Sequence, residues 1–489
     1  MTDAMDPLNR LEFFIDGAWA PARGGEIRDT REAATGEVIG RASIGGPADV
    51  DAAVSAARKA LDHGPWASSS AGERAAVMRR MAGELRGTAD IAVELVSRQN
   101  GMPYQLSSAV NGEAPAGLLE MYAEMIDNQP IEFEGGNSNS IIRCEPVGVV
   151  AAITPWNLPL SLAMMKIAPA LAAGCTIVLK PSPETALDSY LFAEAALAAG
   201  LPPGVLNIVV GDRDAGAHLV SHPGVDKVAF TGSTDAGRAI GAECGRLIRR
   251  VTLELGGKSA AIILDDADLD SFVSGLGDTT FMNNGQVCTS QARILAPRLR
   301  YHEVVDAVAE YVRSLKVGNP LDPQITCGPM VSERHQQKVL GYIEKGKSSA
   351  ARLVAGGSPH NGPGWFVQPT LFADVDNADV IAREEIFGPV AAVIPYSSES
   401  EAIAIANDSN YGLGGSVWTA DEERGLSVAR QIRTGTVGVN FYSYDLGAPF
   451  GGMKDSGIGR ELGVQGLHNY FELKTVYRRP AVVNRVSQT

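Results

Sequence analysis

Cys288 and Glu254 are the two side chains of this sequence whose types and settings best suit covalent catalysis. A thiolate attacks a carbonyl carbon well, and a carboxylate held near water can act as a general base. Cys288 lies in the segment NNGQVCTSQAR, where Asn283 to Gln286 give it a polar and backbone-flexible approach. Glu254 ends the strand-like run VTLEL and is followed by two glycines, which allow the backbone to turn tightly. The pair therefore suits a reaction in which a thiolate forms an adduct and water later releases the product.

Each of these residues also has a plainer interpretation. A cysteine is most often a small buried hydrophobic residue, and a glutamate at a strand end is usually a solvated charge. Asn157, in a turn between Pro155 and Pro159 after the run GVVAAIT, has the setting of an ordinary turn residue. It also lies where a parallel strand ends, which is where open α/β sheets bind ligands. The motifs around these residues decide between the interpretations.

Several motifs occur in one collinear order along nearly the whole chain. They are TPWNLPL (154–160), VLKPSPET (178–185), AFTGSTDAGR (229–238), LELGGKSA (253–260), NNGQVCTSQAR (283–293), EEIFGPV (384–390) and PFGGMKDSGIGRELG (449–463). Together they resemble the aldehyde dehydrogenase superfamily, in its NAD(P)-dependent, hydrolytic, non-acylating form. The resemblance implies that an aldehyde is oxidised to its carboxylic acid through a thiohemiacetal and then a thioester on Cys288.

The same resemblance gives Cys288, Glu254 and Asn157 separate catalytic roles. A carbonyl carbon must become tetrahedral before it can lose a hydride, and the Cys288 thiolate would achieve this. The side-chain amide of Asn157 and the backbone N–H of Cys288 would hold the resulting alkoxide. Glu254 would activate the water that hydrolyses the thioester.

Cofactor binding is expected around GSTDAG (232–237), which follows the strand KVAFT and opens a helix. The N-terminus of such a helix can hold a pyrophosphate, although the segment has only two of the three glycines of the GxGxxG fingerprint. By resemblance Lys180 contacts the adenosine ribose, Glu385 the nicotinamide ribose, and Phe387 packs near the ring. The cofactor-binding residues implied are Ile153, Thr154, Pro155, Trp156, Lys180, Ser182, Glu184, Gly211, Phe230, Thr231, Gly232, Ser233, Gly237, Leu255, Gly256, Glu385 and Phe387.

The choice between NAD and NADP depends on one departure from the family pattern. Many NAD-preferring members carry a glutamate three residues after the lysine, where it can bond the adenosine ribose. Here that position is Pro183, and Glu184 comes one residue later. We expect NAD as the cofactor, with NADP as an open alternative.

The substrate is expected to be a small aldehyde without charge. By resemblance a tunnel would be lined by Leu162, Met165, Phe281, Phe441, Tyr442, Tyr444 and Phe450. Apolar residues of this kind are also typical of plain core. No arginine stands out that would hold a carboxylated semialdehyde, which favours an apolar aliphatic, terpenoid or aromatic aldehyde.

Composition limits the other partners. The net charge of −15 argues against nucleic acid or an anionic membrane as a partner. The sequence has neither a targeting segment nor a long apolar run, so a cytoplasmic location is the default expectation. Its five cysteines are widely spaced, without CxxC or a histidine at metal-ligand spacing, which favours a reduced protein that binds no metal.

Elements that would position these residues follow an α/β pattern. From residue 148 to 264, β-branched runs alternate with Ala-rich helical stretches, which predicts a mostly parallel, Rossmann-like sheet. A second α/β series follows Cys288, with helices at 302–315 and 399–407 and a strand-like run at 435–441. The predicted domains are residues 1–125 and 147–256 for NAD(P) binding, 257–455 for catalysis, and 126–146 with 468–489 as a small β oligomerisation arm. The arm implies a homodimer or homotetramer.

Two other functions remain open at this point. One is a CoA-acylating dehydrogenase, in which CoA rather than water resolves the thioester; the presence of Glu254 favours water. The other is a catalytically silent binding or structural relative, since folds are reused without their chemistry. Such a relative would have lost Cys288, Glu254 or Asn157, and all three are present.

Overall fold

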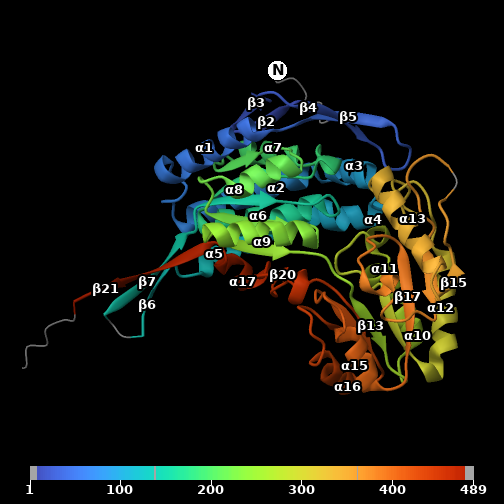
Figure 1. The fold of residues 1–489 in the computed structure, drawn as a ribbon. Helices are drawn as coiled ribbons and strands as arrows, with labels where there is room; N and C mark the ends of the chain where they lie inside the picture. The colour runs from blue at the N-terminus through green and yellow to red at the C-terminus, as the bar shows by residue number, and fades with distance from the viewer. Residues whose placement is uncertain (1–7, 137–138, 361, 480–489) are drawn as a thin grey trace, which may run out of the picture.

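The apolar runs between residues 148 and 264 form the centre of an eight-stranded sheet in the computed structural model, which describes residues 8–136, 139–360 and 362–479 (Figure 1). The central strands are parallel and buried along their whole length, as expected for a sheet covered on both faces. Antiparallel strands extend both edges. In spatial order the strands are β20 (Gly457–Ile458), β12 (Arg250–Glu254), β11 (Lys227–Thr231), β8 (Val149–Ile153), β9 (Thr176–Lys180), β10 (Leu206–Ile208), β2 (Glu12–Ile15) and β3 (Ala18–Pro21).

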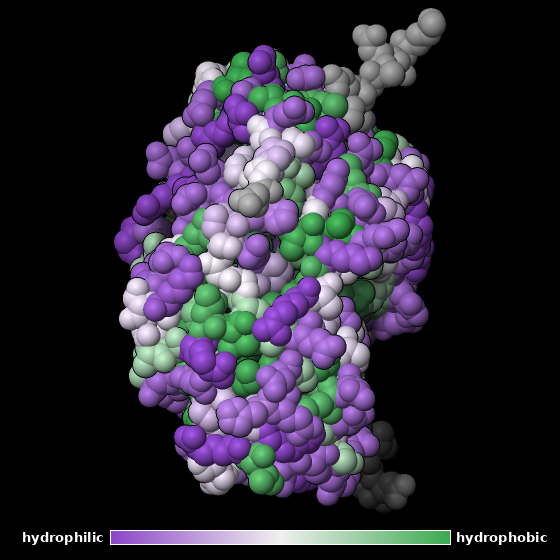
Figure 2. All heavy atoms as spheres, turned by 90° about the vertical axis from the view of Figure 1, so that its right-hand side faces the viewer, coloured by the Kyte–Doolittle hydropathy of each residue, from purple (hydrophilic) through white to green (hydrophobic). Residues whose placement is uncertain are grey.

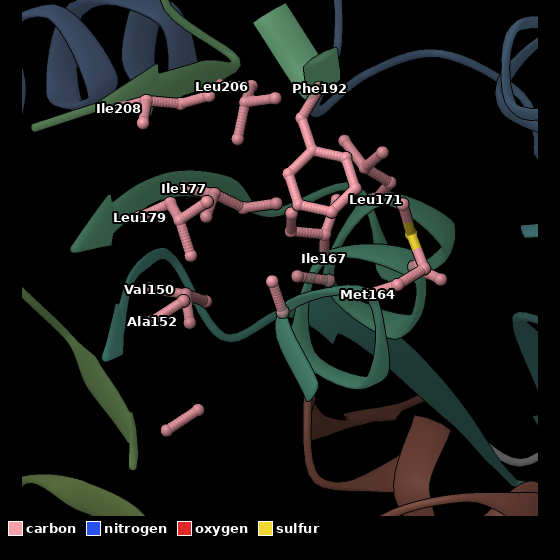
Figure 3. Packing of buried hydrophobic residues seen from close by; sticks show 14 of the residues in the cluster. Val150, Ala152, Met164, Ile167, Leu171, Ile177, Leu179, Phe192, Leu206 and Ile208 are labelled. Atoms are coloured by element: carbon pink, nitrogen blue, oxygen red, sulfur yellow. The ribbon is translucent and has the colours of Figure 1, made fainter. Parts of the chain in front are cut away.

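Successive side chains of each strand point to opposite faces of the sheet, so both faces are apolar, and helices cover both. On one face, Figure 3 shows Val150, Ala152, Ile177, Leu179, Leu206 and Ile208 beside Met164, Ile167 and Leu171 of α6 (Pro159–Ala173) and Phe192 of α7 (Tyr190–Ala198). On the other face, Thr176 Oγ1 donates to the backbone oxygen of Ala57 in α1 at 3.0 Å. The remaining helices of this part are α1 (Pro47–His63), α2 (Ala71–Gly87), α3 (Ala89–Asn100), α4 (Tyr104–Ser107), α5 (Ala114–Asn128), α8 (Arg213–Ser221) and α9 (Thr234–Leu247).

A second, seven-stranded sheet follows in the chain and is parallel except for its edge strand β15. Its strands, in spatial order, are β15 (Arg352–Ala355), β16 (Thr370–Ala373), β17 (Val390–Tyr396), β14 (Arg293–Pro297), β13 (Ala260–Ile263), β18 (Gly415–Trp418) and β19 (Gly438–Val439). Two separate apolar clusters, one on each face, pack the surrounding helices against this sheet. These helices are α10 (Leu269–Ser274), α11 (Leu276–Thr279), α12 (Tyr301–Ser314), α13 (Glu333–Lys347), α14 (Val380–Arg383), α15 (Glu399–Asn407) and α16 (Glu422–Ala429).

The surface around α12, α13 and β15 mixes hydrophilic side chains with smaller groups of hydrophobic ones (Figure 2). Throughout the described ranges, no helix combines the length and the apolar composition that crossing a membrane requires.

Two small sheets complete the fold. One is β6 (Glu132–Glu134), β7 (Ser140–Pro146) and β21 (Phe471–Tyr477), which projects from the body of the molecule at the lower left of Figure 1. Strands β7 and β21 pair antiparallel across more than 300 residues of sequence, with Phe471 opposite Pro146 and Tyr477 opposite Ser140. The other is β1 (Asn9–Arg10), β5 (Val38–Ile44) and β4 (Glu26–Arg31) near the N-terminus, which the sequence did not predict.

The α/β class with two main sheets and a small antiparallel sheet is confirmed, while some boundaries differ. The helix expected at 399–407 is α15, and the one expected at 302–315 is α12, shifted by one residue. The run 435–441 contributes only the two residues of β19. The strand expected from 468 begins at Phe471, because Gly463–His468 forms the helix α17. Positions 1–7, 137–138 and 480–489 of the predicted domains lie outside the described residues.

After the second sheet the chain returns to the first. Strand β20 pairs antiparallel with β12, with Gly457 opposite Glu254. The segment that follows brings Glu461 into the interior, where only 3% of its surface is exposed. Residues from near the C-terminus therefore surround the candidate base.

Candidate active site

A cleft of about 990 Å³ runs along the carboxyl ends of β8, β9, β11 and β12 and reaches Cys288. Its size is at the upper end of the range for cofactor and ligand sites, and its place at the strand ends is where open α/β sheets bind ligands. Every residue predicted to bind the cofactor lines this cleft except Gly237. Gly237 lies in α9, where an added Cβ would come within 2.4 Å of Leu255 Cδ2. Its missing side chain therefore lets α9 pack against the end of β12.

The N-terminus of α9 opens into the cleft. Ser233 caps the helix and accepts a hydrogen bond from Ala236 N at 3.4 Å. Gly232, just before the cap, lies against the ring of Phe230, so that a Cβ there would be 2.5 Å from Cζ. The first backbone N–H groups of a helix have no partner within the helix, and Gly232 leaves space in front of them. This end of α9 therefore suits a pyrophosphate.

Lys180 and Glu184 line the cleft at the carboxyl end of β9. Lys180 Nζ donates to the backbone oxygens of Pro181 at 3.1 Å and Gly211 at 2.5 Å. Burial lowers the pKa of Lys180 to about 8. Glu184 accepts a hydrogen bond from Ser182 Oγ and lies 3.6 Å from the guanidinium of Arg334. Because Glu184 lines the cleft together with Pro183, a carboxylate is available at this end despite the proline.

Cys288 follows a tight turn of three left-handed residues, Asn283 (φ 48°), Asn284 (φ 61°) and Gly285 (φ 74°). The expectation of a flexible approach is wrong, because this turn is buried and fixed by hydrogen bonds. Asn283 Nδ2 donates to Asn157 O at 2.9 Å, and Asn284 Nδ2 donates to Gly101 O at 2.9 Å. The polar side chains satisfy buried backbone acceptors, which a buried turn requires.

The Cys288 thiol is held in its protonated form. Burial raises its pKa to about 12, and the charges of Glu385 and Glu254 raise it as well. The backbone N–H groups of Cys288 and Thr289 act in the opposite direction. In this environment a nearby positive charge or a base is needed to generate the thiolate.

Asn157 follows β8 and is 97% buried in the wall of the cleft beside Cys288. Its Nδ2 donates to the backbone oxygen of Gln286 at 3.1 Å. An amide nitrogen carries two hydrogens, so a second donor remains. Its backbone oxygen accepts from Asn100 at 3.1 Å as well as from Asn283. The side chain is thereby fixed close to the turn that carries the thiol.

Glu254 is 96% buried, and neither of its carboxylate oxygens has a hydrogen-bond partner within the described part of the chain. Burial, and then the charge of Glu461, raise its pKa well above the ordinary value, while Lys166 and Arg460 lower it. Lys166 is fully buried and donates to Glu461 at 2.7 Å and to Thr231 Oγ1 at 2.6 Å. A buried carboxylate whose lone pairs are free is suited to accept a proton from water.

The structure separates the residues predicted for the substrate tunnel. Leu162 lines the cleft together with Cys288. Phe450 is buried with its ring 5.6 Å from that of Tyr444, whose hydroxyl lies 2.6 Å from Thr289 Oγ1. Met165 is also buried nearby, on the same helix as Leu162, but Met165 and Phe450 do not line the cleft.

Two of the tunnel residues lie elsewhere. Phe281 packs with Tyr311 in the core of the second sheet, which is the plain-core interpretation. Phe441 is 62% exposed, because the run that carries it leaves the sheet after Val439. Neither lines the cleft.

Several residues that line the cleft were missed by sequence reasoning. Five of them carry a cationic or imidazole side chain: Arg28, Arg213, Arg334, His335 and Lys338. Three of them lie on α13, where Lys338 is three residues after His335 and four after Arg334 and so shares a helix face with both. Arg28 comes from the unpredicted N-terminal sheet. Their only sequence signal is the spacing on α13, and that spacing does not reveal which element the helix faces.

Comparison with known proteins agrees with this geometry. The model of the aldehyde dehydrogenase family matches residues 19–476. The chain is 50% identical over 474 residues to geranial dehydrogenase of Castellaniella defragrans, covering 96% of this chain and 99% of that protein. A crystal structure of Mycobacterium tuberculosis aldehyde dehydrogenase complexed with NAD+ matches with a TM-score of 0.94 at 47% identity, covering 96% and 98% of the two chains. A mutant of aldehyde dehydrogenase C from Pseudomonas syringae, solved with NAD+ and octanal, matches with a TM-score of 0.94 at 38% identity, covering 98% and 99%.

The buried, unpartnered carboxylate of Glu254 leads to a prediction about the order of steps. Glu254→Gln removes the carboxylate but leaves the thiol and the cleft intact. We expect a rapid burst of about one NADH per active site followed by slow turnover, because the thioester forms and is not hydrolysed. Rapid mixing measures the burst, and intact-mass spectrometry should find an acyl group on Cys288.

Two controls accompany this variant. Cys288→Ala should bind cofactor but give neither burst nor adduct, and Cys144→Ala, on the half-buried strand β7, should behave as the wild type. A folded Glu254→Gln variant that binds cofactor but shows neither burst nor adduct would mean that Glu254 acts before hydride transfer. Its assignment as a base for water alone would then be wrong.

Proposed function

The chain belongs to the aldehyde dehydrogenase family, and we propose that it oxidises uncharged, apolar aldehydes to carboxylic acids with NAD, through a Cys288 thioester that water resolves. One observation carries this proposal. The thiol of Cys288 and the amide of Asn157 lie in the wall of one dinucleotide-sized cleft, and the buried carboxylate of Glu254 is close enough to act on the thiol's pKa.

Cofactor binding is assigned to the residues of the cleft. The N-terminus of α9, with Gly232 and Ser233, suits the pyrophosphate, and Lys180 with Glu184 suits the adenosine ribose. Glu385 and Phe387 are assigned to the nicotinamide end, next to Cys288. NAD bound in this way would supply the hydride acceptor.

Formation of the adduct is assigned to Cys288 and Asn157. The sulfur attacks the carbonyl carbon, the C=O π pair moves to oxygen, and the thiol proton leaves for a base. The free hydrogen of the Asn157 amide and the N–H of Cys288 would then hold the alkoxide. Because Gln286 O already fixes the Asn157 side chain, the donor is oriented before the charge develops.

Release of the acid is assigned to Glu254. A raised pKa is useful for a general base that works near neutral pH, because the group can then both accept and return a proton. Lys166 is paired with Glu461 at 2.7 Å, so its ammonium does not by itself neutralise Glu254. Water rather than CoA is favoured as the acceptor of the acyl group, since a CoA-acylating enzyme has no need of such a base.

The name of one relative and the ligand of another support an apolar substrate. One is geranial dehydrogenase and another was solved with octanal. Leu162 provides apolar surface in the cleft beside Cys288, and Tyr444 and Phe450 form an aromatic pair behind it.

We also propose that the chain forms a homodimer or homotetramer through the arm of β6, β7 and β21. Strand β21 lies at the edge of its sheet, and Leu473 (66%), Val476 (44%) and Tyr477 (83%) expose apolar surface there. An edge strand with exposed apolar side chains tends to pair with another chain.

The first prediction of this proposal concerns the arm. Sedimentation velocity at micromolar concentration should show a closed homo-oligomer for the wild type. Leu473→Glu combined with Tyr477→Glu should shift the protein toward monomer by placing like charges at the interface. Leu299→Glu, at an exposed apolar residue outside the arm, should not. A wild type that sediments as a monomer would contradict the proposal.

A second prediction concerns the aldehyde. kcat/KM should rise about fourfold for each added methylene until the cavity is full, since each buried CH₂ contributes about 0.8 kcal/mol. NADH absorbance across a panel from propanal to octanal, with benzaldehyde and geranial, measures this. Succinic semialdehyde and betaine aldehyde are the charged comparisons. If either outperforms hexanal and benzaldehyde, the apolar assignment is wrong.

A third prediction concerns cofactor choice. NAD should have the higher kcat/KM, with measurable turnover of NADP, because Pro183 provides no carboxylate of its own to repel a 2′-phosphate. Glu184→Ala should raise the NADP-to-NAD ratio by roughly tenfold, since it removes a like charge at the ribose end. Asp235→Ala, which removes a carboxylate elsewhere in the cleft, is the matched control and should leave the ratio unchanged. A wild type that prefers NADP would contradict this prediction.

A further inference from the structure

Three aromatic rings meet edge to face on the wall of the cleft. The centroid of Trp156 lies 5.2 Å from that of His335 and 5.4 Å from that of Phe387, and the last two are 5.9 Å apart. Trp156 follows β8 of the first sheet, whereas His335 lies on α13 and Phe387 precedes β17, both in the second. The three rings therefore join the two sides of the cleft.

His335 also makes a polar contact within this cluster. Its Nε2 lies 2.6 Å from the backbone oxygen of Phe387. A carbonyl oxygen can only accept, so Nε2 carries the hydrogen and donates it. Burial lowers the pKa of His335 to about 4, and the positive charges of Lys338 and Arg334 act in the same direction, while Glu184 opposes them. The ring is therefore neutral near pH 7, and its Nε2–H is a fixed donor.

The acceptor of this hydrogen bond lies in a strained part of the backbone. Phe387 has φ +64°, a left-handed conformation that is rare for a bulky side chain and persists only when its surroundings hold it. Gly388, the next residue, packs against Val339 of α13 and against Gly285, where an added Cβ would lie 2.1 Å from Gly388 O. The strained residue is thus next to the turn that carries Cys288.

The position of Phe387 constrains Glu385, two residues earlier. Glu385 Oε1 accepts from Gly257 N at 3.0 Å, and a Cβ at Gly256 would come within 2.5 Å of Oε2. Space around this carboxylate is therefore limited on the side of β12. A rotation of the Phe387 backbone would have to move Glu385 or break this hydrogen bond.

We propose that His335 is a positioning residue, whose Nε2–H holds the Phe387 backbone in its left-handed conformation and thereby sets Glu385 and Phe387 for the nicotinamide end of the cofactor. This inference rests on the proposed function, which assigns those two residues to that end. His335 acts through Phe387 and takes no part in proton transfer.

The test compares His335→Leu, which removes the donor, with His335→Gln, whose amide nitrogen can reach the same place. His302→Leu, at an exposed histidine of α12 outside the cleft, is the matched control. Calorimetry measures the affinity of each protein for NAD and for ADP-ribose, which lacks the nicotinamide. Rapid mixing with an aldehyde that carries deuterium or hydrogen at C1 measures hydride transfer and its isotope effect.

For His335→Leu we expect hydride transfer to slow by about 10²-fold, as for a reactant held out of place, and its isotope effect to rise. Affinity for NAD should fall while affinity for ADP-ribose stays at the wild-type value. His335→Gln should recover most of the rate, and His302→Leu should match the wild type. If His335→Leu does not fold, His335→Asn, whose amide is too short to reach Phe387 O, takes its place with the same expectation.

Three outcomes would overturn the inference. They are an unchanged rate in His335→Leu, an equal loss of NAD and ADP-ribose affinity, and a His335→Gln variant as impaired as His335→Leu. Failure of the proposed function itself would look different, because the wild type would then form no NADH from any aldehyde of the panel. The comparison of NAD with ADP-ribose needs no turnover and tests His335 in either case.

Discussion

The strained turn from Asn283 to Gly285 is the constraint on which the active site depends. Left-handed backbone at two asparagines costs about 1 to 3 kcal/mol for each, so neighbouring structure must hold the turn. Asn284 ties it to Gly101 and Pro329, at 2.9 and 3.0 Å. Asn157 Nδ2 donates to Gln286 O, and Asn283 Nδ2 donates to Asn157 O. The position of the Cys288 thiol is therefore decided jointly by the end of α3, the loop after β8 and the segment before α13.

Buried charge is the second determinant of the site. Glu254, Lys166 and Glu461 lie together in the interior, with 4%, 0% and 3% of their surfaces exposed. Two carboxylates and one ammonium leave one negative charge to be neutralised, and burial makes that charge costly. Uptake of a proton by Glu254 relieves this cost, which is why its pKa is raised. The uncompensated negative charge destabilises the ionised form of Glu254, and the resulting higher pKa makes the carboxylate a better proton acceptor.

The motifs were enough to predict the family, and local patterns predicted the main elements, but neither predicted the long-range contacts. Helix α15 and the parallel strands β8, β9 and β11 follow from periodicity and β-branched runs. Strand β2 joins the first sheet through Phe14 opposite Ile208, a contact across nearly 200 residues that no local signal encodes. Phe281 and Phe441 show the same limit, since apolar character does not say whether a side chain faces a core, a cleft or solvent. His335 was missed because its contact is with a backbone oxygen fifty-two residues away.

Glycines at the site are needed for space more than for flexibility. A Cβ at Gly257 would lie 2.2 Å from the backbone oxygen of Cys288, and one at Gly451 would lie 2.6 Å from Glu254 Oε1. Gly257 has no left-handed conformation to explain it, so the turning role expected for it is not its main one. Because Cys288 and Glu254 come from separate segments, bringing them close together forces backbone against backbone. Gly257 and Gly451 therefore provide the space that lets Cys288 and Glu254 lie close together.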